Sequence, residues 1–461
     1  MTSPHKEESQ RKTAEENFAE SLSVLLVNFS DRQFEILRLI DHIERSKLEI
    51  DDRARATKEL IESRLNEDLD EEGLEKLYRH LTETQESSEE DVEDKEANLK
   101  VFEEILSSLP EGHVHTYLEN IVRAYRRPPS GEFLFPSLLV TLVGEVEIII
   151  NRLARACYTL NPDLIKDGEQ KIEWREIAHF KTVAEVQEML VDRRIDQLLR
   201  GSLTDWISYF EKKVGIPSIT AVQRRGPLEA VQRRHCIVHN GGHASALYIE
   251  KTSGIKPRPK TEEGDYLPVD PEYLRSTADE LYLVIYSLIW SLGNRFCKED
   301  NARQKFMRSV INGSYYLLQD QRYDLLKLLK SYLPFAQMEA KDALILNTNI
   351  WLAHKLDDDF EAVRHEVERL DVKARSRLFL LTKHALLDET DAASDLAEKM
   401  IRDDELKREH LLTWPLLRDV HHKRGEENAP RGQQALESEE ILTLSSGAND
   451  REEDPMSTTD L

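Results

Sequence analysis

The stretch Arg233-Arg234-His235-Cys236-Ile237-Val238-His239-Asn240-Gly241-Gly242 decides how the middle of this chain folds. Upstream of it, Gly226-Pro227 marks a helix start, because proline suits the first helical position. Gly241-Gly242 marks the helix end, since glycine accepts the left-handed backbone that closes many helices. The spacing therefore predicts a helix of roughly three and a half turns that carries two arginines and two histidines.

One face of this predicted helix combines apolar side chains with both histidines. At about 100° per residue, five residues share a single stripe, namely Leu228, Val231, His235, Val238 and His239. Arg234 lies at the edge of the stripe beside Val238, whereas Arg233 points away from it. Arg234 is therefore the better candidate to act directly with the histidines.

These residue types are the ones that an enzyme needs to cleave RNA without a metal. Histidine has an ordinary pKa near neutrality and can accept and return a proton, while arginine is a permanent cation that fits a phosphate. Two alternatives stay open. Histidines on an apolar face are often core residues, and the spacing of His235 and His239 also suits two zinc ligands, although no nearby cysteine or carboxylate repeats the pattern. We predict no metal and no cofactor.

The motif resembles the active-site signature of the HEPN superfamily, an arginine followed after four to six residues by a histidine. Arg234 and His239 fit it with four intervening residues, and Arg233 fits with five, but the polar His235 next to Arg234 favours the first alignment. The resemblance covers about residues 130–300. It implies an all-helical domain that dimerises with two motifs face to face, and for many members a metal-independent endoribonuclease of toxin or antiviral-defence systems.

The resemblance implies catalytic roles for Arg234, His235 and His239. His239, alone or with His235, is expected to remove the proton from a ribose 2′-hydroxyl, and Arg234 to stabilise the charge on the phosphoryl oxygens. The expected products are a 2′,3′-cyclic phosphate and a 5′-hydroxyl. We assign binding of the RNA substrate to four neighbouring residues: Arg224, Arg225, Arg233 and Asn240.

The alternative function is a non-enzymatic adaptor. In that case the same central domain would only dimerise or bind a nucleotide, and the flanking helices would recruit partner proteins.

Composition indicates an all-α protein with about three domains. Of 461 residues, 39% are hydrophobic and 33% are charged, and glycine and proline are sparse at 17 and 16, which disfavours a turn-rich β architecture. We expect a charged N-terminal helical arm at 1–109, a HEPN-like bundle at 130–300, helical hairpin repeats at 301–423 and a disordered acidic tail at 424–461.

The net charge of −25 would oppose binding of RNA if it were spread evenly. Residues 62–96 carry 15 acidic against 4 basic side chains, and residues 425–461 carry 10 against 2. Between 193 and 239 the balance reverses, with 9 basic against 4 acidic residues. Positive charge is thus concentrated around the predicted site, which favours RNA as a partner, although a charge run is more often a solvated face.

The cysteines and the apolar runs indicate a cytoplasmic protein. Cys157, Cys236 and Cys297 are scattered in apolar surroundings, which predicts reduced, buried residues. The N-terminus lacks the apolar core of a signal peptide, and the runs at 138–150 and 281–292 are too short to cross a bilayer. We therefore expect no membrane role.

Apolar periodicity predicts helices at 138–158, 183–199, 203–214 and 273–296. The first carries Glu145 and Glu147, and an acid there would be placed to orient a catalytic histidine or arginine; exposure or a salt bridge is the alternative. The third displays an aromatic group that suits either stacking on a base or packing in the core: Trp206, Tyr209 and Phe210.

The C-terminal region has a degenerate repeat. Tyr323, Phe360 and Ala393 follow similar helical segments at intervals of 37 and 33 residues, close to the length of tetratricopeptide-like repeats. A plain helical bundle is the alternative. Such repeats would offer a surface for a partner protein.

Overall fold

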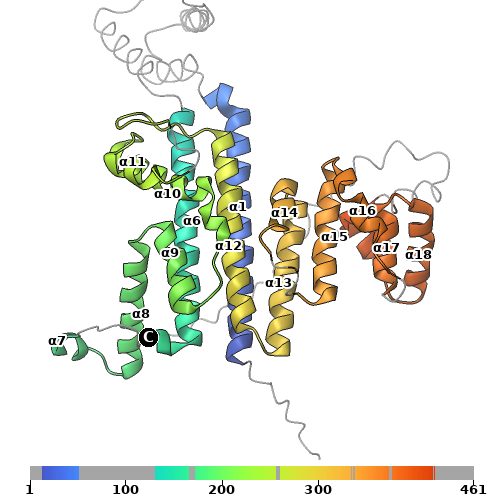
Figure 1. Cartoon of the computed structure of the whole chain (residues 1–461), viewed down its shortest axis with the longest axis horizontal. Helices are drawn as coiled ribbons and strands as arrows, with labels where there is room; N and C mark the ends of the chain where they lie inside the picture. The colour runs from blue at the N-terminus through green and yellow to red at the C-terminus, as the bar shows by residue number, and fades with distance from the viewer. Residues whose placement is uncertain are drawn as a thin grey trace, which may run out of the picture. The chain divides into compact units, whose positions relative to one another are not determined.

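The computed structural model describes residues 13–50, 130–165, 172–255, 260–333, 335, 338–372, 376–418 and 420. Every regular element in these ranges is a helix, and the only strand-like pairing there is an isolated bridge between His243 and Tyr266. The all-α fold class is therefore confirmed (Figure 1). The acidic segment 62–96 and the tail 424–461 lie outside the described residues. The chain divides into two compact units: residues 1–320 with 331–337, and residues 321–330 with 338–461.

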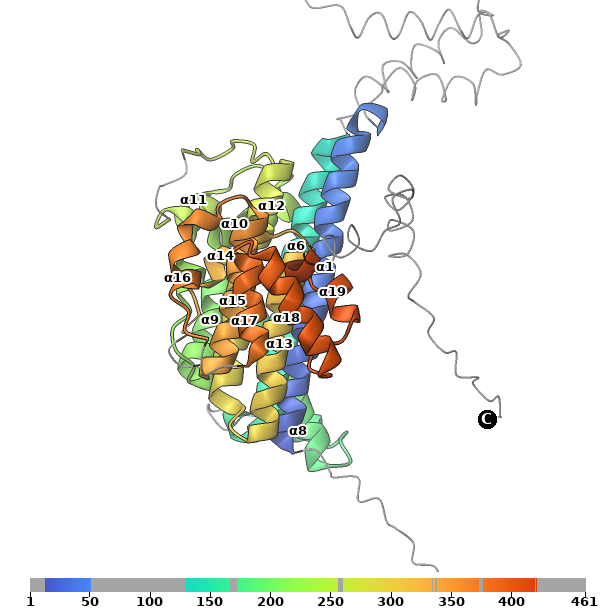
Figure 2. The ribbon, with the colours of Figure 1, turned by 90° about the vertical axis from the view of Figure 1, so that its right-hand side faces the viewer.

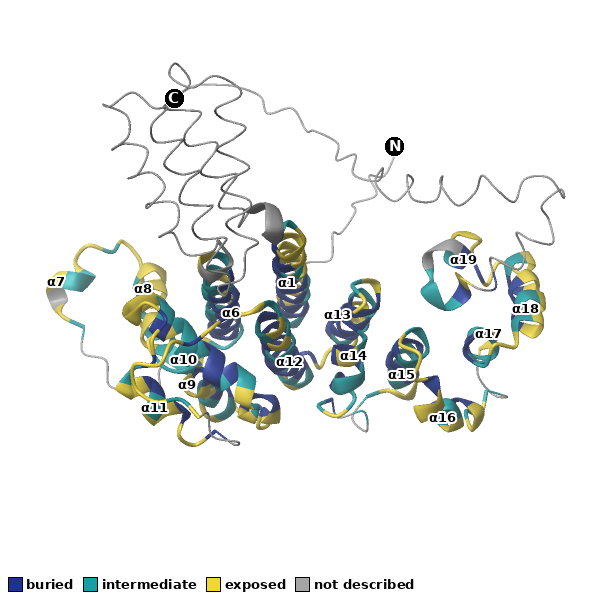
Figure 3. Ribbon diagram, turned by 90° about the horizontal axis from the view of Figure 1, so that it is seen from above, coloured by how far each residue is buried: buried dark blue, intermediate teal, exposed yellow. Residues whose placement is uncertain are grey.

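The first unit is built around four long helices: α1 (Ala14–Ile50), α6 (Ser130–Leu160), α12 (Pro271–Phe296) and α13 (Asp300–Gln319). Every residue of α12 from Leu281 to Trp290 is buried, which is typical of a helix enclosed on all sides. Figure 3 shows α1, α6 and α13 arranged around it. The core of the unit thus lies along α12.

Helix α1 is part of this bundle. The Phe29 ring stacks on Tyr282 of α12 at 5.9 Å between centroids, and the Ser30 and Tyr282 hydroxyls are 2.9 Å apart. The sequence pattern predicted that this helix belongs to a separate N-terminal arm at 1–109. The structure differs because the apolar stripe of α1, which includes Leu22 and Leu26, is buried by α6, α12 and α13.

Helix α13 also belongs to the first unit and not to the predicted repeat region at 301–423. Gly293 of α12 leaves room for the buried Phe306 ring of α13, since a Cβ at that glycine would lie 2.1 Å from the ring. Gly313 lets Leu26 of α1 approach in the same way, since a Cβ at that glycine would lie 3.1 Å from the Leu26 side chain. The boundary between the units therefore falls near residue 320 and not near 300.

Shorter helices cover one side of α6 and α12. The predicted helix at 183–199 matches α8 in both bounds, and its N-cap Thr182 accepts the Glu185 N–H at 3.2 Å. The remaining elements of the unit are η1 (Pro162–Ile165), α7 (Trp174–Ile177), α8 (Val183–Leu199), α9 (Leu203–Tyr209), the π-helix η2 (Phe210–Val214), η3 (Thr220–Gln223), α10 (Arg225–Asn240) and α11 (Ala246–Thr252).

Helix α6 is the one described helix long and apolar enough to cross a membrane, over Phe133–Leu160. Half of its most apolar window is buried inside the protein, with α1, α8, α10 and α12 packed along it. Core helices of soluble proteins have the same composition, so the helix by itself does not indicate a membrane.

The second unit consists of short helices joined by tight turns (Figure 2). Asp358 and Asp388, in the turns after α15 and α17, adopt the left-handed backbone at φ 56° and 60°, and Gln321 does so 37 residues before Asp358. The elements are α14 (Tyr323–Leu329), α15 (Ala340–Leu356), η5 (Phe360–Ala362), α16 (Arg364–Glu368), α17 (Arg377–Leu386), α18 (Thr390–Arg402), α19 (Glu409–Thr413) and η6 (Pro415–Leu417).

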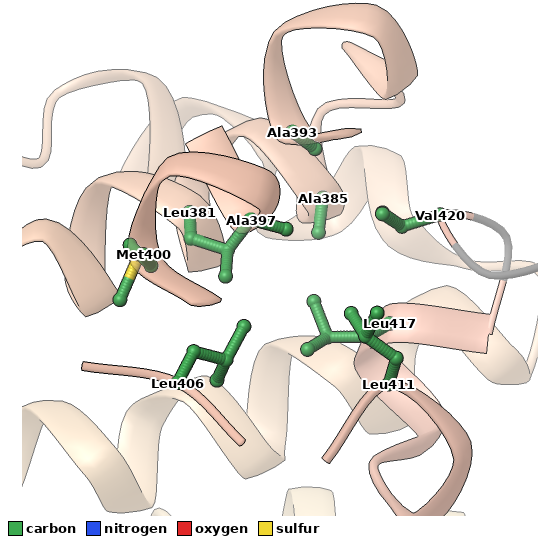
Figure 4. Close-up of a cluster of buried hydrophobic side chains, with 9 residues drawn as sticks. All are labelled: Leu381, Ala385, Ala393, Ala397, Met400, Leu406, Leu411, Leu417 and Val420. Carbon is green, nitrogen blue, oxygen red and sulfur yellow. The ribbon is translucent and has the colours of Figure 1, made fainter. Parts of the chain in front are cut away.

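A small apolar core closes this unit at its C-terminal end. Figure 4 shows side chains from α17 and α18 facing those of the following segment. Ala385, Ala393 and Ala397 lie where α17 meets α18, and small residues there allow close packing of the two helices. The predicted resemblance to tetratricopeptide-like repeats stays a prediction.

All three cysteines are free and buried, as predicted. Burial raises the pKa of Cys157 and of Cys297 to about 12.

Candidate functional site

The predicted site lies on α10, which begins at Arg225 and ends at Asn240. Gly241 and Gly242 follow with φ of 59° and 84°, and both N–H groups donate to the Cys236 carbonyl. The predicted glycine end of the helix is therefore confirmed. Beyond it the chain pairs with a returning segment, where the Leu267 N–H donates to the Gly242 carbonyl at 2.8 Å.

A buried charged network fixes the inner face of α10. The Glu229 carboxylate accepts hydrogen bonds from the hydroxyls of Tyr248 on α11, at 2.7 Å, and Tyr273 on α12, at 2.6 Å. It also pairs with Arg233 at 2.8 Å. The Arg233 guanidinium lies 4.2 Å from the centre of the Tyr273 ring and donates to the Pro268 carbonyl. Burial and the Glu229 carboxylate raise the pKa of Tyr248 and Tyr273, so both hydroxyls remain donors.

The first turn of α10 is held against α12. Arg224, the N-cap residue, donates to the Glu280 carboxylate at 2.8 and 3.1 Å and to the Tyr332 hydroxyl at 3.2 Å. Gly226 permits this approach, because a Cβ there would lie 1.7 Å from Glu280. Arg225 is exposed and has no carboxylate partner among the described residues.

The outer face of α10 presents the two histidines. The His235 and His239 rings are 4.4 Å apart between centroids, and both residues are exposed. The stripe that the sequence predicted is therefore half-buried at Leu228 and Val231 but open to solvent at Val238, which is 49% exposed. The histidines are not core residues.

Arg234 lies next to this pair and is held by an acid from α6. Its guanidinium lies 3.3 Å from the Glu147 carboxylate, and 26% of the side chain is exposed. Its Nε is buried and has no hydrogen-bond partner within the described ranges. Glu147 thus orients Arg234, whereas Glu145 is buried and pairs with Arg32 of α1 at 3.2 Å.

The electrostatic surroundings lower the pKa of His235. Partial desolvation is the main cause, and the neighbouring His239 and Arg234 add to it by charge repulsion. His235 is therefore mostly neutral at physiological pH, and a neutral imidazole is able to accept a proton.

The structure brings together Arg234, His235 and His239, but it gives two of the four predicted substrate ligands other partners. Arg233 and Arg224 are engaged in contacts that hold α10 in place, so their geometry is that of structural residues. Asn240, exposed in the last turn, uses its backbone carbonyl to accept the His243 N–H at 3.2 Å. Of the four, Arg225 and Asn240 have side chains open to a ligand.

Glu147 was named from the sequence as an acid able to orient a catalytic arginine, but the residues that fix the inner face of α10 were not. Glu229 was detectable only as an acid four residues before Arg233, a spacing that pairs side chains on a helix. Tyr248 and Tyr273 gave no signal, because their contacts depend on how α11 and α12 pack. His243 and Tyr266, whose rings meet edge to face at 5.5 Å beside Gly242, were missed as well.

The surroundings of the histidine pair are open. Three pockets lie in the first unit, and neither His235 nor His239 lines any of these three. Exposed apolar side chains occur on two helices that contact α10: Ile148 on α6 is 42% exposed and Leu247 on α11 is 44% exposed. In the described part of the chain, no three His, Cys, Asp or Glu side chains gather as donors for a metal ion.

No protein-family model matches the sequence, and no curated protein or solved structure matches the chain. The resemblance to the HEPN superfamily therefore stays a prediction that depends on the motif of α10.

Proposed function

We propose that this protein is a metal-independent endoribonuclease of the HEPN type, with its catalytic groups on the outer face of α10. The observation that carries the proposal is the exposed pair of imidazoles, 4.4 Å apart, next to a guanidinium that Glu147 holds. A proton acceptor, a proton donor and a fixed cation within one short segment are what cleavage of an RNA linkage requires.

In the proposed reaction His235 removes the proton from the ribose 2′-hydroxyl, because its lowered pKa keeps it neutral. The 2′-oxygen attacks the adjacent phosphorus, and the bond from phosphorus to the 5′-oxygen breaks. His239 returns a proton to that leaving oxygen, and Arg234 stabilises the charge on the phosphoryl oxygens. The products are a 2′,3′-cyclic phosphate and a 5′-hydroxyl, and DNA is resistant because it lacks the attacking hydroxyl.

A second copy of the chain would complete the site. The pair lies on an open surface with the exposed apolar Val238, and Ile148 on α6, which packs against α10, is exposed as well. Burying these side chains across a twofold axis would remove apolar area from water and place two motifs opposite each other. A toxin or defence role rests on the resemblance alone.

The test is an RNA-cleavage assay in EDTA with the full chain. We expect His239→Ala and His235→Ala each to lose activity by about 100- to 10,000-fold, the usual contribution of one acid or base. Their melting temperatures should match the wild type, since both side chains are exposed. His179→Ala, an exposed histidine that precedes α8, is the matched control and should cleave normally. Full activity in His239→Ala would exclude the proposed site.

The adaptor alternative is favoured by one observation, the exposure of the apolar Val238 side chain on the same face of α10 as the pair. It predicts that the wild type dimerises but does not cleave RNA, and that Val238→Glu dissociates the dimer, as measured by light scattering. Cleavage that depends on His239 would reject this alternative.

A further inference from the structure

A second feature of the first unit lies away from the histidine pair. A pocket of about 370 Å³ opens between α8 and α9, within the range of ligand pockets. Two tyrosines, Tyr158 and Tyr209, and two cations, Arg194 and Lys213, line it. The proposed catalytic site on α10 does not use any of these residues.

Helix periodicity explains how the pocket is built. Arg194, Leu198 and Gly201 follow one face of α8 and its C-terminal end at spacings of four and three. Asp205, Tyr209 and Lys213 follow one face of α9 and the π-helix after it at spacings of four. A single π-helical turn is a common device at functional sites, and here it contains Lys213 and begins right after Tyr209.

The polar groups of the pocket suit a planar, negatively charged ligand. The Tyr209 hydroxyl is buried and makes no hydrogen bond of ordinary geometry within the described residues, and its ring lies 6.3 Å from that of Tyr158. The acid at the rim, Asp205, accepts hydrogen bonds from the Ser202 N–H at 2.8 Å and from the Ser202 hydroxyl at 2.7 Å. These hydrogen bonds from Ser202 lower the pKa of Asp205, and the positive charges of Lys251 and Lys212 add to the effect.

Helix α6 relates this pocket to the histidine site. Glu147, which holds Arg234, and Tyr158 are eleven residues apart, so they project within about 20° of each other. Their separation along the helix axis is about 16 Å, at 1.5 Å per residue. The two sites therefore lie on the same side of α6, a few nucleotides of RNA apart.

We propose that the pocket between α8 and α9 binds one nucleotide of the RNA substrate at a distance of a few nucleotides from the cleaved linkage. The inference rests on the proposed endoribonuclease function. The base packs against the tyrosine wall, and the phosphate lies between Arg194 and Lys213. The Tyr209 hydroxyl donates to the base or the ribose.

The binding experiment uses the full chain in a His239→Ala background, a fluorescent single-stranded RNA octamer and anisotropy. Arg194→Ala with Lys213→Ala should weaken binding and reduce the slope of log affinity against log salt by about 0.7, the value for one lost phosphate contact on a single strand. Tyr209→Ala should weaken binding by about tenfold, as expected for one stacked base. Tyr209→Phe keeps the ring and tests the hydroxyl without a change in core volume.

The chain offers matched controls. Arg193, which pairs with Glu176 at 3.2 Å, precedes Arg194, and Lys212 precedes Lys213; neither lines the pocket. Arg193→Ala with Lys212→Ala removes the same charge and should change octamer affinity less than the pocket variants. Equal losses for the two pairs would overturn the proposal and indicate only a diffuse basic surface.

A kinetic readout separates this proposal from the proposed function. With His239 intact, the pocket variants should lower kcat/KM for the octamer but not for a dinucleotide, which is too short to reach the pocket. If the wild type cleaves neither substrate, the endoribonuclease proposal fails, while the octamer-binding result still tests the pocket. If free nucleoside monophosphates bind the pocket with the same variant dependence but the octamer does not, the RNA assignment is overturned.

Discussion

The two faces of α10 use the same kinds of side chain in opposite ways. On the inner face, Arg233 and Glu229 form a buried network with two tyrosines from α11 and α12. On the outer face, Arg234 is held by a single acid and lies beside two exposed imidazoles. Adjacent arginines thus have different surroundings, because neighbouring residues on a helix point about 100° apart.

The motif therefore divides into one half that anchors the helix and another half whose side chains are available for a reaction. The anchoring half needs many partners and tolerates little change. The reactive half needs access to solvent and a few groups with defined orientation.

The inner network gives the largest expected effect on stability. Glu229→Ala should lower the free energy of unfolding by about 3–5 kcal/mol, because it leaves Arg233 and two tyrosine hydroxyls without their buried acceptor. Chemical denaturation measures the change. Glu250→Ala, on the exposed side of α11, is the control and should stay within about 0.5 kcal/mol of the wild type. A loss below about 1 kcal/mol for Glu229→Ala would show that the network does not anchor α10.

Replacement of Arg234 should affect mainly activity, whereas replacement of Arg233 should affect mainly stability. Arg234→Ala should reduce RNA cleavage by about 100- to 1,000-fold, comparable to removal of one donor to a transition-state oxygen, with little change in stability. Arg233→Ala should instead lower the free energy of unfolding by about 3 kcal/mol, since it breaks a buried pair. Cleavage kinetics and denaturation are measured on both proteins. Equal losses of activity and stability in both variants would contradict the different roles of the two arginines.

The two glycines that end α10 give a smaller effect on stability. Gly241→Ala should lower the free energy of unfolding by about 1–2 kcal/mol through backbone strain alone, since its φ is 59° and no atom lies within 4 Å of the added Cβ. Gly242→Ala should cost more, because its Cβ also meets the Tyr266 ring at 2.9 Å. Thermal denaturation ranks the two variants, and the reverse order would contradict the geometry.

The smallest effect is a shift in pH dependence. Because the pKa of His235 is lowered, the acidic limb of the activity profile should lie below pH 6.5, and activity should fall as His235 becomes protonated. In His239→Gln, one of the repelling charges is lost and the pKa of His235 should rise. An NMR titration of the His235 ring protons tests this, and an unchanged or lower pKa would reject the coupling of the two rings.

Local features of the fold could be predicted from the sequence. The bounds of α8 and the end of α10 follow from apolar spacing and from Gly241, which act within a few residues. The start of α12 at Pro271 was two residues earlier than predicted, after Asp270, whose carboxylate accepts the Tyr273 N–H at 2.7 Å. Such caps are encoded next to the helix that they begin.

Long-range features could not be predicted in this way. The place of α1 in the bundle depends on Phe29 meeting Tyr282, about 250 residues later. The different surroundings of Arg233 and Arg234 depend on Tyr273 and Glu147, which lie on other helices. The aromatic residues at the end of α9 and the start of η2 have different surroundings for the same reason: Trp206 and Phe210 are buried in the core, and Tyr209 lines the pocket.

The burial of the three cysteines has a practical consequence for chemical labelling. At neutral pH the thiols of Cys157 and Cys297 hold their protons, and a protonated thiol is a poor nucleophile toward maleimides and peroxides. Cys236 is buried against Tyr248 and Leu267. A cysteine introduced at the exposed Leu247 would therefore be the fast-reacting thiol of the chain, so a fluorophore or spin probe attached there reports on the surface beside α10 without removal of the native cysteines.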